Sequence, residues 1–222
     1  MDHPPEIPEA ALRFFGDRRE LAERFVAHLA DTGVSHGLIG PREVPILWER
    51  HVLNCAVIED AFPSDERVID VGSGAGLPGL AIAIARPDLT VDLVEPMQRR
   101  TEWLQMVTDD LGLDRVTVHR ARAEEVHGVL SAPFVTARAV ARIDKLARWC
   151  FPLVSDGGQL IAMKGRSAPE ELTAATPVLR RLGMSGARIS EHGGDVLDEP
   201  TLTMDLTVQR KRASRAGHQG RK

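Results

Sequence analysis

The chain shows two kinds of hydrophobic spacing, one after the other. Between residues 8 and 31 apolar side chains recur every three to four positions with charged residues between them, and a second such pattern runs from about residue 43 to residue 61. This period predicts amphipathic helices. Pro63-Ser64-Asp65 then interrupts the helical pattern. We therefore expect residues 1–62 to form a helical extension that packs on the core that follows.

Short β-branched runs alternate with helical patterns from residue 63 to residue 209. This alternation is typical of an α/β fold in which right-handed βαβ units build a mostly parallel sheet with helices on both faces. Strands are predicted at residues 68–71, 89–95, 116–119, 134–138, 158–164, 184–190 and 201–209. Helical stretches are predicted at residues 77–85, 97–111, 123–126, 142–151 and 168–182, the last of them broken. The final connection is too short for a helical crossover, so the seventh strand is expected to pair antiparallel.

Composition narrows the class of protein. With 222 residues, of which 43% are apolar, the chain can bury one sizeable core. Its two cysteines, Cys55 and Cys150, stand far apart without metal-ligand spacing, which predicts neither a disulfide framework nor a metal site and favours the cytoplasm. The N-terminus lacks the pattern of a signal peptide, and no stretch reaches the roughly 18 to 20 apolar residues of a membrane span. We expect no membrane association.

Charge is unevenly distributed. The net charge is −4, but the segment from Gln209 to Lys222 holds six Lys and Arg residues and no acid, so residues 1–208 carry −10. Residues 210–222 are expected to form a disordered basic tail, which can serve either as a solubilising terminus or as a nonspecific phosphate-binding arm. The acidic body would bind nucleic acid only through a local basic patch.

A glycine-rich stretch follows the first predicted strand. Residues 68–79 read Val-Ile-Asp-Val-Gly-Ser-Gly-Ala-Gly-Leu-Pro-Gly and lead into an apolar helix. Glycines at such a turn let a ligand approach the backbone closely, and the first βα turn of a parallel sheet is a usual ligand site. The letters from Gly74 to Gly79 match the dinucleotide pattern G-x-G-x-x-G, a weak signal alone. Because the strand pattern ends at residue 71, the pattern in register is instead Asp70-x-Gly72-x-Gly74-x-Gly76.

Three acids at successive strand ends favour S-adenosylmethionine (SAM) over NAD. Asp70 is expected to face the ligand cavity, where a carboxylate attracts the ammonium and sulfonium of SAM and repels a pyrophosphate. Glu95 ends the second predicted strand, where it can accept hydrogen bonds from ribose hydroxyls. Ala123 and Glu124 follow the third strand, beside the expected position of an adenine. Together these positions predict a SAM site.

The same residues carry a family resemblance. Residues 68–79, followed by Ala85-Arg86-Pro87-Asp88, closely resemble the signature of the RsmG (GidB) family of bacterial small-subunit rRNA guanine-N7 methyltransferases, and residues 49–54, 137–139 and 163–165 are similar to further family segments. The resemblance implies a Rossmann-like class I SAM-dependent methyltransferase fold. It implies SAM contacts at Gly72, Leu77, Ala123, Glu124 and Arg138. The implied acceptor is a guanine in the decoding-region (530) loop of 16S rRNA, either free or in the 30S ribosomal subunit.

The implied chemistry needs few catalytic groups. Guanine N7 carries an available lone pair, so no general base is required, and rate depends on in-line placement of the reacting atoms. The chain contains no tyrosine and hence no Asn-Pro-Pro-Tyr motif of exocyclic-amine methyltransferases. Arg138 and Lys164 are candidates for substrate positioning, and the RNA-binding candidates are Arg50, His51, Lys164 and Arg166.

We therefore expect a cytoplasmic, monomeric 16S rRNA (guanine-N7) methyltransferase. Two alternatives stay open at this point: a SAM-dependent methyltransferase of another substrate, and a SAM-binding regulatory protein without turnover.

Overall fold

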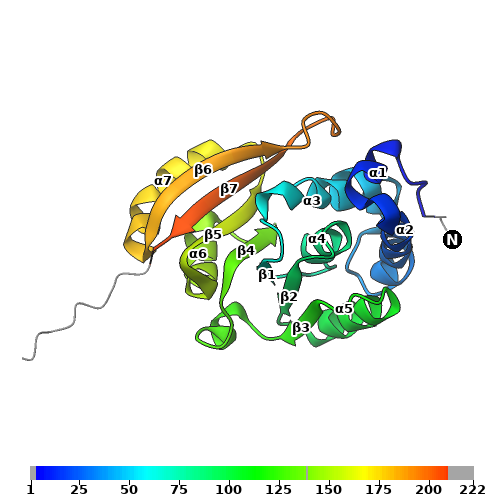
Figure 1. Ribbon diagram of the computed structural model, residues 1–222, viewed down its shortest axis with the longest axis horizontal. Coiled ribbons are helices and arrows are strands. Elements are labelled where there is room, and N and C mark those ends of the chain that lie inside the picture. The colour runs from blue at the N-terminus through cyan, green and yellow to red at the C-terminus, as the bar shows by residue number, and fades with distance from the viewer. Residues whose placement is uncertain (1–3, 139, 210–222) are drawn as a thin grey trace, which may run out of the picture.

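The computed structural model describes residues 4–138 and 140–209 and contains one seven-stranded sheet (Figure 1). The strands are β1 (Arg67–Val71), β2 (Thr90–Glu95), β3 (Val116–Arg120), β4 (Ala132–Arg138), β5 (Val154–Lys164), β6 (Met184–His192) and β7 (Thr201–Val208). Their order across the sheet is β3-β2-β1-β4-β5-β7-β6. Strand β7 runs antiparallel to both of its neighbours, and the other pairings are parallel. The predicted mostly parallel sheet is thus confirmed.

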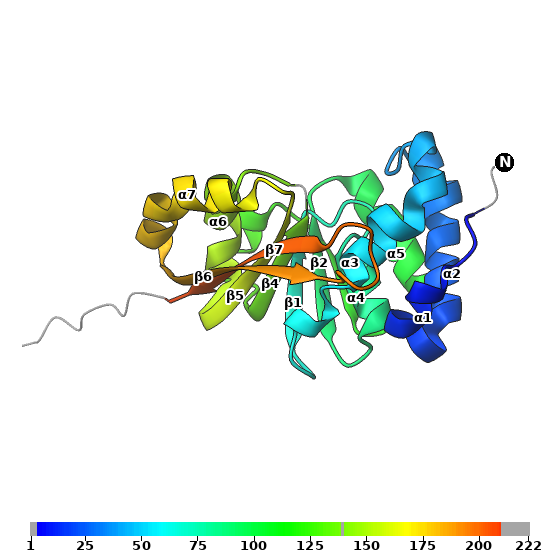
Figure 2. The same cartoon turned by 90° about the horizontal axis from the view of Figure 1, so that it is seen from above.

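The sheet reverses its order of strand addition beside β1. From β1 the chain first adds β2 and β3 on one side and then crosses to add β4 and β5 on the other. Ligands of open α/β sheets bind at such a switch point, beyond the carboxyl ends of the strands. The hairpin β6–β7 closes one end of the sheet, opposite the N-terminal helices (Figures 1 and 2).

Alternation along the strands sends side chains into two cores. Val68 packs in the core shared with α4 and the N-terminal helices, whereas its neighbour Ile69 packs in the core shared with α6 and α7. The helices of the sheet region are α4 (Gly79–Ala85), α5 (Gln98–Asp110), α6 (Ile143–Cys150) and α7 (Ala168–Leu182), with a 3₁₀ turn at Ala123–Val126. No helix among the described residues is long and apolar enough to cross a membrane.

Helix α7 corrects one prediction. The sequence predicts a broken helix at residues 168–182 because Pro177 lacks an N–H donor, yet the helix is continuous. Its buried residues Ala175 and Leu179 lie on either side of the proline and pack in the core with α6. Packing of this face offsets the missing hydrogen bond.

The N-terminal helices are more irregular than the pattern predicts. The single helix expected for residues 8–31 is divided into α1 (Glu9–Phe15) and α2 (Arg19–His28), because Gly16 adopts a φ of +44° and ends the first helix. The second pattern forms a 3₁₀ turn (Pro41–Ile46), a π-helical segment (Leu47–Leu53), α3 (Asn54–Ala56) and a 3₁₀ turn (Glu59–Ala61). These segments share one hydrophobic core with α4, so the extension packs directly on the sheet region. The basic tail, residues 210–222, lies outside the described residues.

Candidate cofactor and acceptor site

The glycine loop joins β1 to α4, and its glycines have two different roles. A Cβ on Gly76, whose φ is +79°, would lie 2.4 Å from the Leu80 side chain, so this glycine is required for packing. A Cβ on Gly74, whose φ is +54°, would meet no atom closer than 3.8 Å. Gly74 therefore faces open space, where a ligand can approach the backbone.

Asp70 corrects an expectation about this loop. The carboxylate does not face a cavity, since it is completely buried. Its Oδ2 accepts a hydrogen bond of 3.0 Å from the N–H of Gly79, and its Oδ1 is buried without a partner. Burial raises the pKa of Asp70 to about 7, although the Gly79 N–H opposes the shift. Asp70 thus fixes the start of α4 from beneath, with its carboxylate enclosed by the protein.

Glu95 lies beside the open side of the loop. Only 2% of it is exposed, at the end of β2. Its Oε2 accepts a hydrogen bond from the N–H of Gly74 at 3.1 Å, and its Oε1 accepts one from the N–H of Met97 at 3.0 Å. The Arg100 guanidinium lies 3.6 Å from Oε2. Because a carboxylate offers about four lone-pair sites, capacity remains for a ligand hydroxyl.

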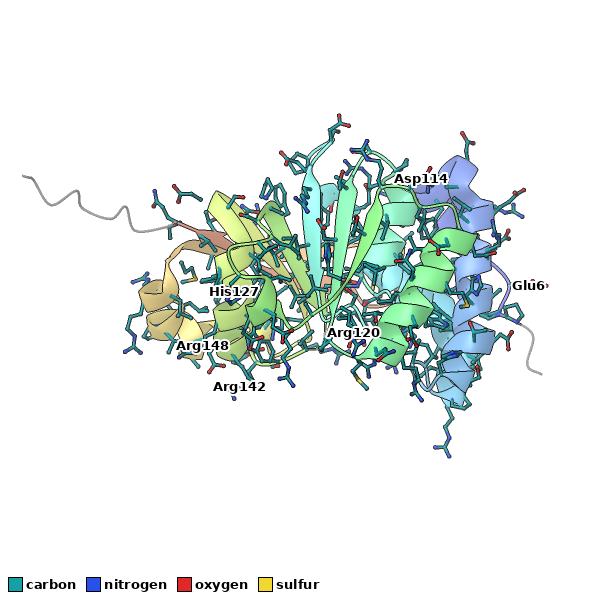
Figure 3. The ribbon with its side chains drawn as sticks, turned by 90° about the horizontal axis from the view of Figure 1, so that it is seen from below. Glu6, Asp114, Arg120, His127, Arg142 and Arg148 are labelled. Atoms are coloured by element: carbon teal, nitrogen blue, oxygen red, sulfur yellow. The ribbon has the colours of Figure 1, made fainter. Side chains whose placement is uncertain are left out.

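The remaining predicted cofactor residues follow the same edge of the sheet. Ala123 and Glu124 begin the 3₁₀ turn after β3, with Ala123 buried and Glu124 exposed, and Leu77 is buried just before α4. In Figure 3 this edge of the sheet is marked by two labelled residues, Arg120 at the end of β3 and Arg142 beyond the end of β4. The carboxyl ends of the strands therefore bring together residues from four separate turns.

Arg138, at the end of β4, binds the N-terminal extension. Its guanidinium donates hydrogen bonds to the carbonyl oxygens of Arg50 (3.0 Å) and His51 (3.3 Å), to His51 Nδ1 (3.0 Å) and to the Sγ of Cys55 (3.0 Å). Burial raises the pKa of the Cys55 thiol, so it accepts this bond as a neutral group. The next residue, Ala139, lies outside the described residues. Arg138 therefore joins the sheet to residues 50–55.

His51 is held between Arg138 and Glu43. Its Nε2 lies 2.8 Å from Glu43 Oε2, while its Nδ1 accepts from Arg138. This network assigns the proton of a neutral imidazole to Nε2. Burial and the Arg138 charge lower the pKa of His51, against the opposing effect of Glu43. The neutral form is thus the one that fits both neighbours.

Lys164 and Arg166 are both paired. Lys164 Nζ, at the end of β5, donates to the carbonyl oxygen of Ala141 (2.9 Å) and to Glu171 Oε1 (3.0 Å), which also accepts the N–H of Ile143. Arg166 forms an exposed ion pair with Glu199. The sequence analysis did not identify Glu171 as a partner of Lys164. The local signal for this pair is that Glu171 lies seven residues after Lys164, in the first turn of α7.

Two clefts open beyond the ends of β4 and β5. The larger, of about 800 Å³, is lined by strand-end residues such as Ala137, Met163 and Lys164. The smaller, of about 510 Å³, lies between residues 43–54 and residues 196–199 of the β6–β7 loop. Four residues line both clefts: Asn54, Arg138, Asp198 and Glu199.

The predicted site residues therefore fall into two groups. The glycine-loop group, which lines neither cleft, comprises Asp70, Gly72, Gly74, Leu77, Glu95, Ala123 and Glu124. Arg138, Lys164, Arg50, His51 and Arg166 all line one or both clefts. Val140 separates the groups, because it lines the larger cleft and its Cγ2 would lie 2.9 Å from a Cβ on Gly72.

Comparison with known proteins decides the family. A family model described as "GidB: rRNA small subunit methyltransferase G" matches residues 18–194. The chain belongs to this methyltransferase family. It is 54% identical over 202 residues to the ribosomal RNA small subunit methyltransferase G of Paenarthrobacter aurescens (strain TC1), covering 91% of this chain and 94% of the relative. The corresponding Streptomyces coelicolor protein is 52% identical, with 90% and 84% covered.

Solved structures place the RsmG family member within the methyltransferase fold. A putative S-adenosyl-L-methionine-dependent methyltransferase from Methanococcus maripaludis aligns with a TM-score of 0.56 at 14% identity, covering 96% of this chain and 99% of that one. TYW2 from M. jannaschii, solved in complex with AdoMet, aligns with a TM-score of 0.56 at 16% identity, with 74% and 78% covered. At these identities the likeness establishes the fold alone, and it confirms the predicted fold class.

Proposed function

We propose that this protein transfers the methyl group of SAM to N7 of a guanine in the decoding-region (530) loop of 16S rRNA. The observation that carries the proposal is the family match, which extends from residue 18 in the N-terminal helices to residue 194, just after β6. The glycine loop at the switch point and the two clefts beyond β4 and β5 support it, because they offer separate places for a cofactor and an acceptor base.

The residues of the loop fit SAM. Gly74 faces open space beside the Glu95 carboxylate, so a ligand can approach the backbone and donate hydroxyls to Glu95. The residues proposed to hold the cofactor are Gly72, Gly74, Leu77, Glu95, Ala123, Glu124 and Arg138. When bound, SAM supplies an electrophilic methyl group on a sulfonium. Asp70 contributes indirectly, by fixing Gly79 behind the loop.

The clefts fit an acceptor that needs placement more than proton transfer. Guanine N7 attacks with its own lone pair, so the chain has to orient the base and exclude water. Arg138 and Lys164 are proposed to position the acceptor by fixing the walls of the clefts, since their donors bind residues 50–55 and the Ala141 carbonyl. Both side chains act as fixed donors and neither has to release a proton.

Two partners are proposed on the RNA side: free 16S rRNA and the 30S subunit. Arg50 is exposed, and no hydrogen bond or ion pair of its guanidinium is found among the described residues, so it is available for a phosphate. His51 and Arg166 are proposed to contact RNA from the same side of the clefts. We also propose that the enzyme is a cytoplasmic monomer, which size-exclusion chromatography tests.

Two measurements test the function. Calorimetry with SAM should show binding, and incubation with 30S subunits from a strain that lacks the enzyme should produce N7-methylguanosine at one position. Absence of SAM binding or of N7 methylation in both free rRNA and 30S subunits contradicts the proposal. Binding of SAM without methyl transfer to any RNA would identify a SAM-binding regulatory protein instead, and transfer to another substrate class would identify a different methyltransferase.

A further inference from the structure

Some hydrogen-bond acceptors that line the smaller cleft have no partner among the described residues. Most of its polar side chains are already paired inside the protein. Glu43 pairs with His51, both ring nitrogens of His51 are bonded, Asn54 donates to Thr201, Arg138 binds residues 50–55, and Glu199 pairs with Arg166. Among the described residues, three lining side chains have no such partner: Glu49, Arg50 and Asp198. A ligand in this cleft therefore meets two free carboxylates and one free guanidinium.

Asp198 is distinguished from Glu49 by its position. It lines both clefts, whereas Glu49 lines only the smaller one. Asp198 therefore borders both cavities, as do Asn54, Arg138 and Glu199. Of the three unpartnered side chains, Asp198 is the one that a base in either cleft can reach.

Two exposed ion pairs flank Asp198 in its loop. Asp195 forms an ion pair with Arg13 of α1, and Glu199 forms one with Arg166. Between them, the N–H groups of Val196 and Leu197 donate to the carbonyl oxygen of Gly193 at 3.0 and 2.8 Å. Figures 1 and 2 show this β6–β7 loop reaching from the hairpin toward α1 and α3. The carboxylate is thus presented from a defined turn.

The charge of the smaller cleft suits a base better than a phosphate. Its lining includes four carboxylates, from Glu43, Glu49, Asp198 and Glu199, against two guanidiniums. A phosphate would be repelled inside, so the RNA backbone has to remain at the rim. A nucleobase with hydrogen-bond donors is the part of an RNA that this lining accepts.

Guanine has such donors on the edge away from its nucleophile. During methylation N7 has to remain free, so recognition falls to the N1–H and N2–H donors of the Watson–Crick edge, which one carboxylate can accept together. Adenine offers an acceptor at N1 and is excluded. Methylation also places positive charge on the purine, which a carboxylate bonded to that edge stabilises.

Building on the proposed function, we infer that Asp198 is the specificity-determining residue that binds the Watson–Crick edge of the acceptor guanine. The inference rests on the free carboxylate that borders both clefts, on the paired state of the other lining groups, and on the donor pattern of guanine.

The experiment compares guanine with inosine, which keeps N7 and N1–H but lacks the N2 amine. Small subunits are assembled with either base at the target position, and N7 methylation is measured for the wild type, Asp198→Asn and Glu49→Gln. The wild type should prefer guanine by about tenfold or more. Asp198→Asn should lower kcat/KM on guanine by about 10- to 100-fold and reduce the preference for guanine over inosine to near one. Glu49→Gln should keep the wild-type ratio.

Calorimetry with SAM on each variant separates base recognition from cofactor binding, and Asp198→Asn should retain wild-type affinity for SAM because residue 198 is not in the glycine-loop group. Unchanged guanine preference in Asp198→Asn overturns the inference, as does a loss of preference in Glu49→Gln alone. If the wild type methylates neither base at N7, the proposed function itself fails. If the wild type methylates guanine and inosine equally, only the assignment of Asp198 fails.

Discussion

The glycine loop and the clefts beyond β4 and β5 are built in opposite ways. The loop is made by backbone groups near in sequence: the N–H of Gly79 bonds Asp70, nine residues earlier, and the N–H of Gly74 bonds Glu95, 21 residues later. The clefts are made by side chains from distant segments, as when Arg138 binds the carbonyl oxygen of Arg50 across 88 residues. A short motif can therefore specify the first region, whereas the second exists only after the extension has packed on the sheet.

The two regions also differ in how they use charge. In the loop the Asp70 carboxylate is buried with one oxygen unpartnered, whereas Lys164, which lines the larger cleft, pairs with Glu171. Substitutions in the loop should therefore change the affinity for SAM and the pH dependence of stability. Substitutions in the clefts should change the interaction energy between segments that are distant in the sequence. Four predictions test this difference.

Gly74→Asp should have the largest effect on cofactor binding. Asp tolerates a positive φ, so the fold should survive, but the new carboxylate would fill the open space next to Glu95. We expect SAM affinity to fall by at least about 100-fold, or about 2.7 kcal/mol, in calorimetry. Gly112→Asp is the matched control, because Gly112 also has a positive φ of +62° and no atom within 4 Å of its Cβ position, but lies before β3. Equal SAM affinity in both variants would refute the assigned role of Gly74.

Asp70→Asn should change how stability depends on pH. The native pKa of about 7 lies above the ordinary value near 4, so native Asp70 holds its proton more tightly than the unfolded chain does. The contribution of Asp70 to the wild-type free energy of unfolding is therefore largest below about pH 4. It falls as the pH rises from about 4 to about 7 and is constant at higher pH. Asn removes this slope, which is worth on the order of 4 kcal/mol. Urea unfolding from pH 4 to 8 measures it, and parallel curves for both proteins would contradict the prediction.

Arg138→Lys should separate the extension from the sheet. Lys keeps the charge but loses the planar fork that reaches Arg50, His51 and Cys55 at once. We expect the free energy of unfolding to fall by about 2 kcal/mol in urea denaturation. Arg142→Lys, where the wild-type side chain is 78% exposed and pairs with Asp144 at 3.6 Å, should change it by less than about 0.5 kcal/mol. Similar losses in both variants would show that Arg138 does not join the two segments.

The pair Lys164 and Glu171 should give the smallest effect. Its side chains are 11% and 17% exposed, so a double-mutant cycle with Lys164→Met and Glu171→Gln should yield a coupling of about 1 kcal/mol. The same cycle on Arg166 and Glu199, which are 83% and 66% exposed, should yield less than about 0.5 kcal/mol. Equal couplings would remove the distinction between an internal and a surface pair.

Much of the fold was predictable because the signals are local. A period of two or of about 3.6 residues is a property of a short window, and it located all seven strands and the 3₁₀ turn at Ala123–Val126. The same holds for the glycine loop, whose register follows from where the strand pattern ends. The division at Gly16 and the continuity of α7 through Pro177 were missed, because each depends on competition between a local breaker and the packing around it.

Sequence alone therefore determined the strands, the glycine loop and the family resemblance, all of which reside in neighbouring residues. Only the tertiary structure decided what the charged residues do. It buried Asp70 beneath α4, paired Lys164 with Glu171, turned Arg138 toward residues 50–55 and left Asp198 free beside both clefts. The physical reason is that a charged side chain is defined by its solvation and its partner, and both are fixed only when segments far apart in the chain pack together.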